Sequence, residues 1–191
     1  IVGIHYFDPA RTVLSEDLVR MNNQIRHRGP DDSGEMVFGQ TGIGMRRLSI
    51  IDLSAGHQPL ANEDDSVWIV FNGEIYDFQK VREDLIKAGH TFRTHTDTEV
   101  MVHAYESEGD KFISRLNGMF GFAIWDKNKQ RLLLGRDRLG KKPIYYYKDA
   151  EKFIWASELK SLFSFPELKL EVNPQALDEF MTWEYSLGPQ T

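Results

Sequence analysis

Four apolar runs in the second half of the chain constrain the fold most strongly. They are residues 119–125 (MFGFAIW), 131–137 (RLLLGRD), 143–148 (PIYYYK) and 152–157 (KFIWAS), and turn-like segments separate them. Short runs joined by turns in this way predict an antiparallel sheet. The apolar residues occupy consecutive rather than alternate positions, which is typical of a sheet covered on both faces.

The rest of the chain supplies further strands and the helices that cover them. Apolar runs predict strands at residues 1–7, 35–38, 42–48 and 67–71. Apolar residues at helical spacing predict helices at residues 15–26, 78–88 and 98–108. Helices placed between and around two such sheets indicate a layered sandwich of the α+β class.

Length and composition bound the class of protein. The chain has 191 residues, of which 41% are hydrophobic and 27% charged, and this matches one compact globular domain. The net charge of −6 comes without a basic block, so nothing favours binding to nucleic acid or to an anionic membrane. No apolar run approaches the roughly 20 residues that cross a bilayer. We therefore expect a cytoplasmic protein, and the absence of cysteine fits a reducing compartment.

The end of the chain differs from the rest. We place one domain at residues 1–170, because a new helix is expected to begin at Pro174 and to give way to loop-like residues. Residues 171–191 are interpreted as a linker or as the start of a further domain of a longer polypeptide.

The pair Asn72-Gly73 follows an apolar run and allows two interpretations. It is a strong hairpin-turn signal, because both residues tolerate positive φ. The functional alternative is an oxyanion hole, in which the Asn72 amide and the Gly73 N–H donate to an oxygen that becomes negative when an amide carbonyl is attacked.

The segment 96–99 (TDTE) precedes an apolar helix. Thr96 and Glu99 have the spacing of a capping box, which is a structural role. Asp97 at the same helix N-terminus is a candidate partner for a substrate ammonium group. The two roles are compatible.

Arg47 is the candidate anion-binding residue. Arg46-Arg47 is either a solvated charge pair at the end of a strand or a site where the planar guanidinium of Arg47 holds a carboxylate with two hydrogen bonds.

The histidines give no prediction of a metal site. Their spacing matches no familiar ligand arrangement, so we expect them to be structural or exposed: His27, His57, His90, His95 and His103.

Taken in order and spacing, these segments resemble the N-terminal glutaminase domain of asparagine synthetases, a class II glutamine amidotransferase of the N-terminal-nucleophile hydrolase fold. The resemblance extends over nearly the whole chain. The segments that carry it are Gly3-Ile4, 27–34 (HRGPDDSG), 46–53 (RRLSIIDL), 56–60 (GHQPL), 71–78 (FNGEIYDF), 96–100 (TDTEV), 116–126 (LNGMFGFAIWD), 136–147 (RDRLGKKPIYYY) and 156–162 (ASELKSL).

The resemblance implies a four-layer α/β/β/α sandwich with two stacked antiparallel sheets. It also implies that Arg47 binds the α-carboxylate of L-glutamine, that Asp97 and nearby Glu74 hold the α-amino group, and that Asn72 and Gly73 form the oxyanion hole. The backbone beside Arg47 would shape the same pocket: Leu48, Ser49, Ile50 and Ile51.

The family's nucleophile is an N-terminal cysteine, whose own α-amino group acts as the base. Aligning Gly3-Ile4 with the family puts Val2 at that position, where no nucleophilic atom is available. Three explanations stay open: an altered form of a working glutaminase, a natural degenerate domain, or misread or trimmed residues at the start. His5, where the family has a small residue, is a further departure.

The function implied by the resemblance is hydrolysis of glutamine to glutamate and ammonia, and with Val2 at the nucleophile position we expect the chain to be inactive. The ammonia would pass to an ATP-dependent synthetase domain on the C-terminal side. We expect no cofactor in this domain, since ATP and magnesium belong to the synthetase domain, and the resemblance implies a homodimer. The alternative is a degenerate domain kept as a scaffold or amino-acid-binding module of a β-lactam synthetase-like enzyme.

Overall fold

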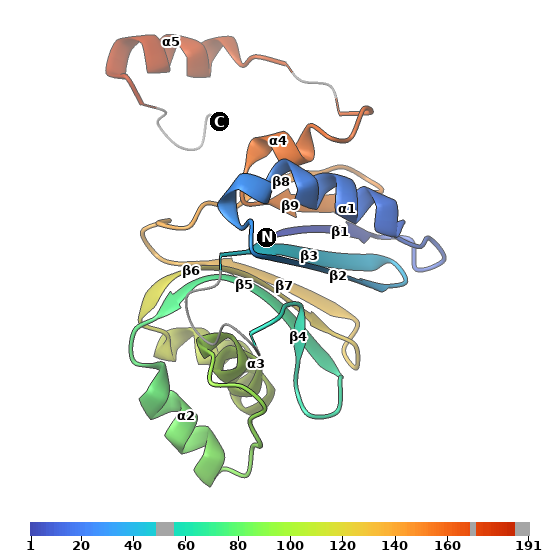
Figure 1. The fold of residues 1–191 in the computed structure, drawn as a ribbon. Helices are drawn as coiled ribbons and strands as arrows, with labels where there is room; N and C mark the ends of the chain where they lie inside the picture. Colours follow the sequence, from blue (N-terminus) through green and yellow to red (C-terminus); the bar gives the residue numbers. More distant parts are fainter. Residues whose placement is uncertain (49–55, 169–170, 186–191) are drawn as a thin grey trace.

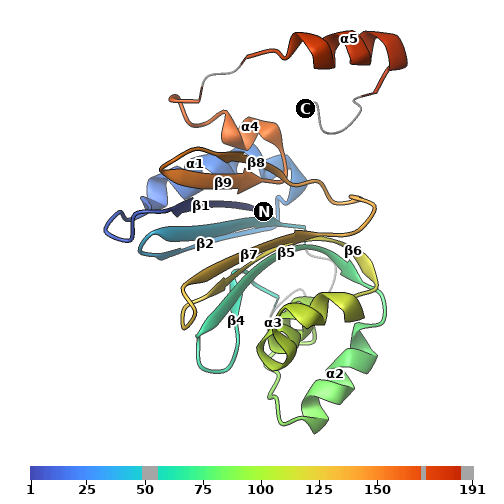
Figure 2. The same cartoon turned by 180° about the vertical axis from the view of Figure 1, so that it is seen from behind.

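The computed structural model describes residues 1–48, 56–168 and 171–185, and it contains two antiparallel sheets stacked between layers of helices (Figures 1 and 2). The five-stranded sheet has the order β2 (Asp32–Phe38), β3 (Thr41–Arg47), β1 (Val2–Tyr6), β9 (Lys152–Ala156) and β8 (Tyr145–Lys148). The four-stranded sheet has the order β4 (Leu60–Ala61), β5 (Val67–Ile75), β6 (Gly118–Asp126) and β7 (Arg131–Arg136).

Helices cover the outer face of each sheet (Figure 1). On the five-stranded sheet these are α1 (Ser15–Gln24) and α4 (Leu159–Leu162), with the 3₁₀ turn η1 (Arg26–Arg28) after α1. On the four-stranded sheet they are α2 (Phe78–Lys87) and α3 (Asp97–Glu108), followed by the 3₁₀ segment η2 (Gly109–Arg115). The predicted four-layer α/β/β/α sandwich is confirmed, as are its helices to within two residues at each end.

The last helix, α5 (Pro174–Trp183), lies beyond α4 and away from both sheets (Figure 1). Its N-terminus is capped by Asn173, whose Oδ1 accepts from the N–H groups of Gln175 and Ala176. None of its residues is buried. The helix predicted at Pro174 is confirmed, and the domain boundary near residue 170 stays a prediction.

Two predictions from local pattern were wrong. The four apolar runs of residues 119–157 do not form one sheet, because β6 and β7 belong to the four-stranded sheet whereas β8 and β9 belong to the five-stranded sheet. The strand predicted to end in a turn at Asn72-Gly73 instead continues to Ile75, with Asn72 opposite Gly121 and Gly73 opposite Phe120. Pairing with β6 outweighs the local preference of Asn-Gly for a turn.

Alternation of side chains along the strands divides the core into three layers. In β1, Val2 and Ile4 pack against α1, whereas Ile1 joins the layer between the sheets. In β5, Val70 faces the layer between the sheets, whereas Phe71 packs against α3. Side chains of odd-numbered residues at the start of β1, and of even-numbered residues in β5, therefore face one another between the sheets.

Candidate active site

A cavity of about 240 Å³ opens at one end of the layer between the sheets. It is smaller than the roughly 300–1,000 Å³ of drug-sized ligand sites, so it suits a ligand of amino-acid size. The predicted site residues that line it are Arg47, Leu48, Asn72, Gly73, Glu74 and Asp97. Residues 49–51, predicted beside Arg47, lie outside the described part of the chain.

The last residue of β3, Arg47, supplies the buried cation of the cavity. Its exposed fraction is only 8%. Its neighbour Arg46 points to the opposite face of the strand, where its guanidinium donates to the Asn22 carbonyl at 3.4 Å and to Asn23 on α1. Both arginines line the cavity, but alternation along β3 separates their side chains: that of Arg46 joins β3 to α1, and that of Arg47 lies on the other face of the strand.

The backbone of β5 turns a row of N–H groups toward the same edge. Phe120 lies opposite Gly73, but its backbone polar groups are directed to its other side: its carbonyl accepts from the Asp137 N–H at 2.8 Å, and its N–H donates to the Asp137 carboxylate at 3.2 Å. The polar groups of Gly73 therefore face away from β6. The N–H groups of Phe71 and Ile75 also face away from β6: that of Phe71 donates to Gln58 Oε1 at 2.6 Å, and that of Ile75 donates to Asp97 Oδ2 at 3.0 Å. The Gly73 N–H lies between them and faces the cavity.

Position 73 needs glycine because two strands approach closely there. A Cβ on Gly73 would lie 2.2 Å from the Met119 carbonyl oxygen. Its neighbour Asn72 is half-buried, and its side chain faces the layer between the sheets by the alternation of β5. Asn72 and Gly73 can therefore offer a side-chain amide and a backbone N–H to one oxygen.

The carboxylate of Asp97 stands at the first turn of α3 with an exposed fraction of 5%. Burial raises its pKa, and the nearby Glu74 carboxylate acts in the same direction, while N–H donors from Ile75 and Thr98 oppose the rise. Asp97 thus adds a buried carboxylate to the cavity that Arg47 also lines. A cationic partner would compensate the burial of that carboxylate.

Half of the predicted capping box is present at this helix. Thr96 Oγ1 accepts from the Glu99 N–H at 3.3 Å. The Glu99 carboxylate accepts instead from the N–H groups of Arg93 and Thr94, each at 2.7 Å. Glu99 therefore holds the segment that leads into the helix. Within that segment the Thr96 N–H donates to Thr94 Oγ1 at 3.2 Å.

Two predicted residues lie at the rim. Glu74 is exposed, and Leu48 has an exposed fraction of 55%. Both line the cavity and can contact a ligand. The Glu74 carboxylate stays in contact with water.

The side chain of Val2 does not reach the cavity. It is fully buried among residues that pack against α1, on the opposite face of β1. Ile1, one position earlier, does line the cavity. In this chain the Ile1 amine donates to Ser157 Oγ at 2.8 Å, and burial, aided by the charge of Arg28, lowers its pKa to about 5.

Sequence reasoning assigned no role to several other lining residues. Gln58, within the segment 56–60, accepts from the Phe71 N–H and donates to Thr98 Oγ1 at 3.2 Å, so it ties β5 to the start of α3. Arg28 and Lys142 add cationic side chains to the lining. No local pattern marks these three as neighbours, because three separate segments carry them.

Asp137 supports the wall behind Gly73. Its carboxylate accepts from the N–H groups of Phe120, Leu139, Lys141 and Lys142 at 2.9–3.2 Å. Burial alone would raise its pKa, but these donors outweigh it and lower the pKa to about 2.

No helix among residues 1–48, 56–168 and 171–185 is both long enough and apolar enough to cross a membrane.

Comparisons with known proteins identify the family of this chain. A family model described as a glutamine amidotransferase domain matches residues 1–191. Asparagine synthetase [glutamine-hydrolyzing] 1 of Bacillus subtilis is 42% identical over 192 residues, which cover 100% of this chain and 30% of the relative. A putative asparagine synthetase [glutamine-hydrolyzing] of Methanocaldococcus jannaschii is 36% identical, with 94% of this chain and 38% of the relative covered.

Solved structures share the fold. Glutamine phosphoribosylpyrophosphate amidotransferase from B. subtilis, complexed with ADP and GMP, superposes with a TM-score of 0.70 at 19% identity. The match covers 85% of this chain and 42% of that chain. The chain spans about a third of the length of the relatives that it matches.

Proposed function

The chain belongs to the glutamine amidotransferase domain family, and we propose that its cavity binds L-glutamine in an orientation ready for attack on the side-chain amide. Arg47 binds the α-carboxylate, Asp97 binds the α-ammonium group with Glu74 at the rim, and the amide carbonyl lies between Asn72 and Gly73. An amino acid needs one cationic partner, one anionic partner and donors for its reacting carbonyl, and the cavity lining holds all three.

The observation that carries this proposal is the orientation of the Gly73 N–H. Its neighbours on the same edge, at Phe71 and Ile75, already donate to Gln58 and Asp97. Only the N–H between them is directed into the cavity, where a carbonyl oxygen that gains negative charge would accept from it. Removal of one such donor typically slows an acyl-transfer reaction by about 100-fold or more.

Cleavage requires a nucleophile on the correct face of β1. The 191 residues include no cysteine, and Val2 faces α1. In the register of β1 and β3, Val2 lies opposite Gly44, so a residue placed two positions ahead of Ile1 would extend β1 opposite Arg47. It would also share the face of Ile1, which lines the cavity. We expect a thiol there to reach the carbonyl.

An added amino-terminal cysteine would also supply the base. Its α-amino group has an ordinary pKa near 8, so it is partly neutral at working pH and can take the thiol proton. The thiolate attacks the amide carbon, and the amide nitrogen takes the proton from the α-ammonium group and leaves as ammonia, so that a thioester forms. Water then hydrolyses the thioester to glutamate and the free thiol.

The role of the whole protein is a wider proposal. We propose that the ammonia passes to an ATP- and magnesium-dependent synthetase domain that continues from the C-terminal side. The apolar side chains that α5 exposes support a covering by further chain: Leu177, Phe180, Met181 and Trp183. A homodimer and a cytoplasmic location remain predictions.

Amino-terminal variants test this proposal. Cys-Gly added ahead of Ile1 should produce glutamate and ammonia from glutamine, whereas an Ala-Gly addition should not. A third variant, with Ile1 removed and Val2→Cys, tests the other alignment and should stay inactive because its thiol faces α1. Activity in the third variant alone would overturn the assignment of the nucleophile to the face of β1 that Ile1 shares.

The second candidate is an amino-acid-binding or scaffold domain without turnover. It rests on the composition of the chain, whose 191 residues include no cysteine and can bind glutamine without a thiol to cleave it. If the Cys-Gly variant is folded and binds glutamine but releases no ammonia, the domain is a binding module. If it is folded and binds no glutamine, the scaffold role is supported and the proposed pocket is wrong.

A further inference from the structure

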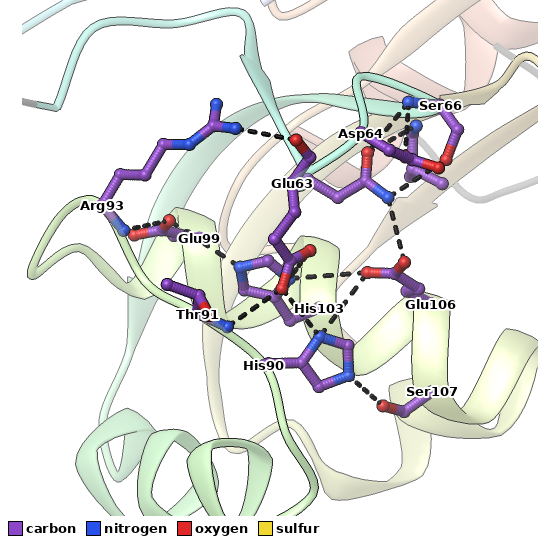
Figure 3. Close-up of polar contacts among 12 residues, drawn as sticks. Glu63, Asp64, Ser66, His90, Thr91, Arg93, Glu99, His103, Glu106 and Ser107 are labelled. Carbon is purple, nitrogen blue, oxygen red and sulfur yellow. Dashed lines mark hydrogen bonds and ion pairs between the residues drawn. The ribbon is translucent and has the colours of Figure 1, made fainter.

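Four potential metal ligands meet on the side of α3 away from its N-terminus: Glu63, His90, His103 and Glu106 (Figure 3). One ligand atom from each lies within 4.8 Å of the others. Glu63 follows β4, His90 follows α2, and His103 and Glu106 lie three residues apart on one face of α3. The sequence predicted no metal site because these residues come from three separate segments.

Four nitrogen–oxygen distances in the cluster are close to the donor separations around a small tetrahedral ion. His103 Nδ1 lies 3.2 Å from Glu63 Oε2 and 3.5 Å from Glu106 Oε2. His90 Nδ1 lies 3.3 Å from Glu63 Oε1 and 3.6 Å from Glu106 Oε2. Zinc bonds of roughly 2.0–2.2 Å in tetrahedral geometry separate adjacent donors by roughly 3.3–3.6 Å.

His103 gives independent evidence that a ligand is needed. Its side chain has an exposed fraction of only 1%. Among the described residues, neither ring nitrogen makes a hydrogen bond of good geometry, and the dashed lines that reach the ring in Figure 3 are contacts with carboxylate oxygens at 3.2–3.7 Å. A buried imidazole whose nitrogens lack well-formed hydrogen bonds destabilises the fold, and a bound ion would give Nδ1 a partner.

Residues outside the cluster contact the other polar atoms of His90, His103 and Glu106. His90 Nε2 contacts Ser107 Oγ at 2.7 Å, and His103 Nε2 faces Glu99 Oε1 at 3.7 Å. The Glu106 Oε1 atom accepts from Asn62 Nδ2 at 3.1 Å. Metal-binding histidines usually direct their second nitrogen to a partner of this kind, which fixes the ring with its ligand atom toward the ion.

We propose that Glu63, His90, His103 and Glu106 bind one divalent transition-metal ion, with Zn²⁺ as the best match. The ligands are the two Nδ1 atoms, Glu106 Oε2 and the Glu63 carboxylate, which lies with Oε1 toward His90 and Oε2 toward His103. The two carboxylates balance the charge of the ion. Four protein ligands leave no open position, so the site is structural rather than catalytic.

The rival occupant of the cluster is a proton. Burial lowers the pKa of His103, but the carboxylates of Glu99, Glu63 and Glu106 outweigh it and raise the pKa. A protonated His103 would hold the same carboxylates without a metal. It would not produce stoichiometric metal binding, which separates the two interpretations.

A bound ion would brace the segment that leads into the cavity. His90 lies at the start of residues 88–96, and Glu99 holds the later part of that segment through Arg93 and Thr94. Glu63 is joined to the same segment, because the Thr91 N–H donates to its Oε1 at 3.0 Å. The metal would therefore stabilise residues 88–96, which precede Asp97, whether or not the cavity binds glutamine.

Cobalt titration of the chain, without an affinity tag and after treatment with a chelator, tests the proposal. We expect one Co²⁺ per chain, visible absorption bands typical of tetrahedral coordination, and displacement of the cobalt by one equivalent of Zn²⁺. The melting temperature should rise with added Zn²⁺. Absence of stoichiometric binding, or an octahedral spectrum, would overturn the proposal.

Matched variants identify the ligands. His90→Gln and Glu106→Gln should each weaken Zn²⁺ binding by about 100-fold or more. His27→Gln and Glu83→Gln, on exposed residues outside the cluster, should leave it unchanged. Circular dichroism without metal checks that each variant is folded. Unchanged affinity in folded His90→Gln and Glu106→Gln would contradict the assignment.

Discussion

Helix α3 contributes to two sites that differ in the way their residues are distributed along the chain. Its first residue, Asp97, faces a cavity whose other main residues come from contiguous strand segments. Two turns further on, His103 and Glu106 meet Glu63 and His90, which belong to separate connecting segments. The residues of the cavity are close together within a few sequence segments, so a sequence pattern can indicate them. The residues of the cluster come from separate segments that only tertiary packing brings together.

The two sites also differ in the sign and arrangement of their charged side chains. The cavity keeps Arg47 and Asp97 as buried ions of opposite sign that a zwitterionic ligand can satisfy. The cluster places three carboxylates within 4 Å of one buried histidine, an arrangement that a cation satisfies. Each site thus needs a different kind of ligand, and the two can be perturbed separately.

The largest expected effect is that of Arg47→Ala on glutamine affinity. Loss of the buried guanidinium leaves the α-carboxylate without its cationic partner, and we expect about 100-fold weaker binding by calorimetry. Arg46→Ala is the matched control, because that guanidinium binds Asn22 and Asn23 on α1. Equal losses in the two variants would break the distinction between the faces of β3, and Co²⁺ binding should survive both changes.

A smaller effect is expected for Asp137→Ala, which removes the acceptor of four backbone N–H groups behind the cavity. Unfolding by urea should show a loss of about 2–3 kcal/mol. The native carboxylate, with its pKa lowered to about 2, stabilises the fold above pH 4. That contribution disappears as the pH falls toward 2, so the difference between the two proteins should shrink there. A constant difference would contradict the assignment.

The smallest effect is expected for Asp97→Asn. Asparagine can still accept from the Ile75 N–H, so the fold should be kept, while affinity for glutamine falls about tenfold with the loss of the anion. The pKa of Asp97 lies above its ordinary value of 3.8, so native binding should weaken as the pH falls through that raised pKa. The variant should lack this acid-side decline, and calorimetry at several pH values would detect it. Retention of the decline would assign it to another group.

Much of the cavity could be predicted from the sequence, because its residues occur in contiguous segments of distinctive order. Arg47, Asn72, Gly73 and Asp97 were expected together and all line one cavity. The local interpretation of Asn72-Gly73 as a turn failed, since pairing with β6 is a long-range interaction that no short pattern records. Gln58 was missed as a support for the same reason.

The start of β1 and the metal-ligand cluster show where sequence reasoning ends. Alignment alone placed Val2 at the nucleophile position, but alternation along β1 directs its side chain to α1. For the cluster, only His103 and Glu106 lie close in sequence, and an i, i+3 pair is common on ordinary helices. Contacts between the turn after β4, the segment after α2 and α3 depend on tertiary packing.

Calorimetric titration of the chain with L-glutamine tests the central claim most directly, because binding gives saturating heats whereas turnover displaces the baseline for as long as substrate lasts. We expect saturable heat with one site per chain and no sustained displacement. Absence of heat at two temperatures would contradict the claim that Arg47, Asn72, Gly73 and Asp97 form a glutamine site.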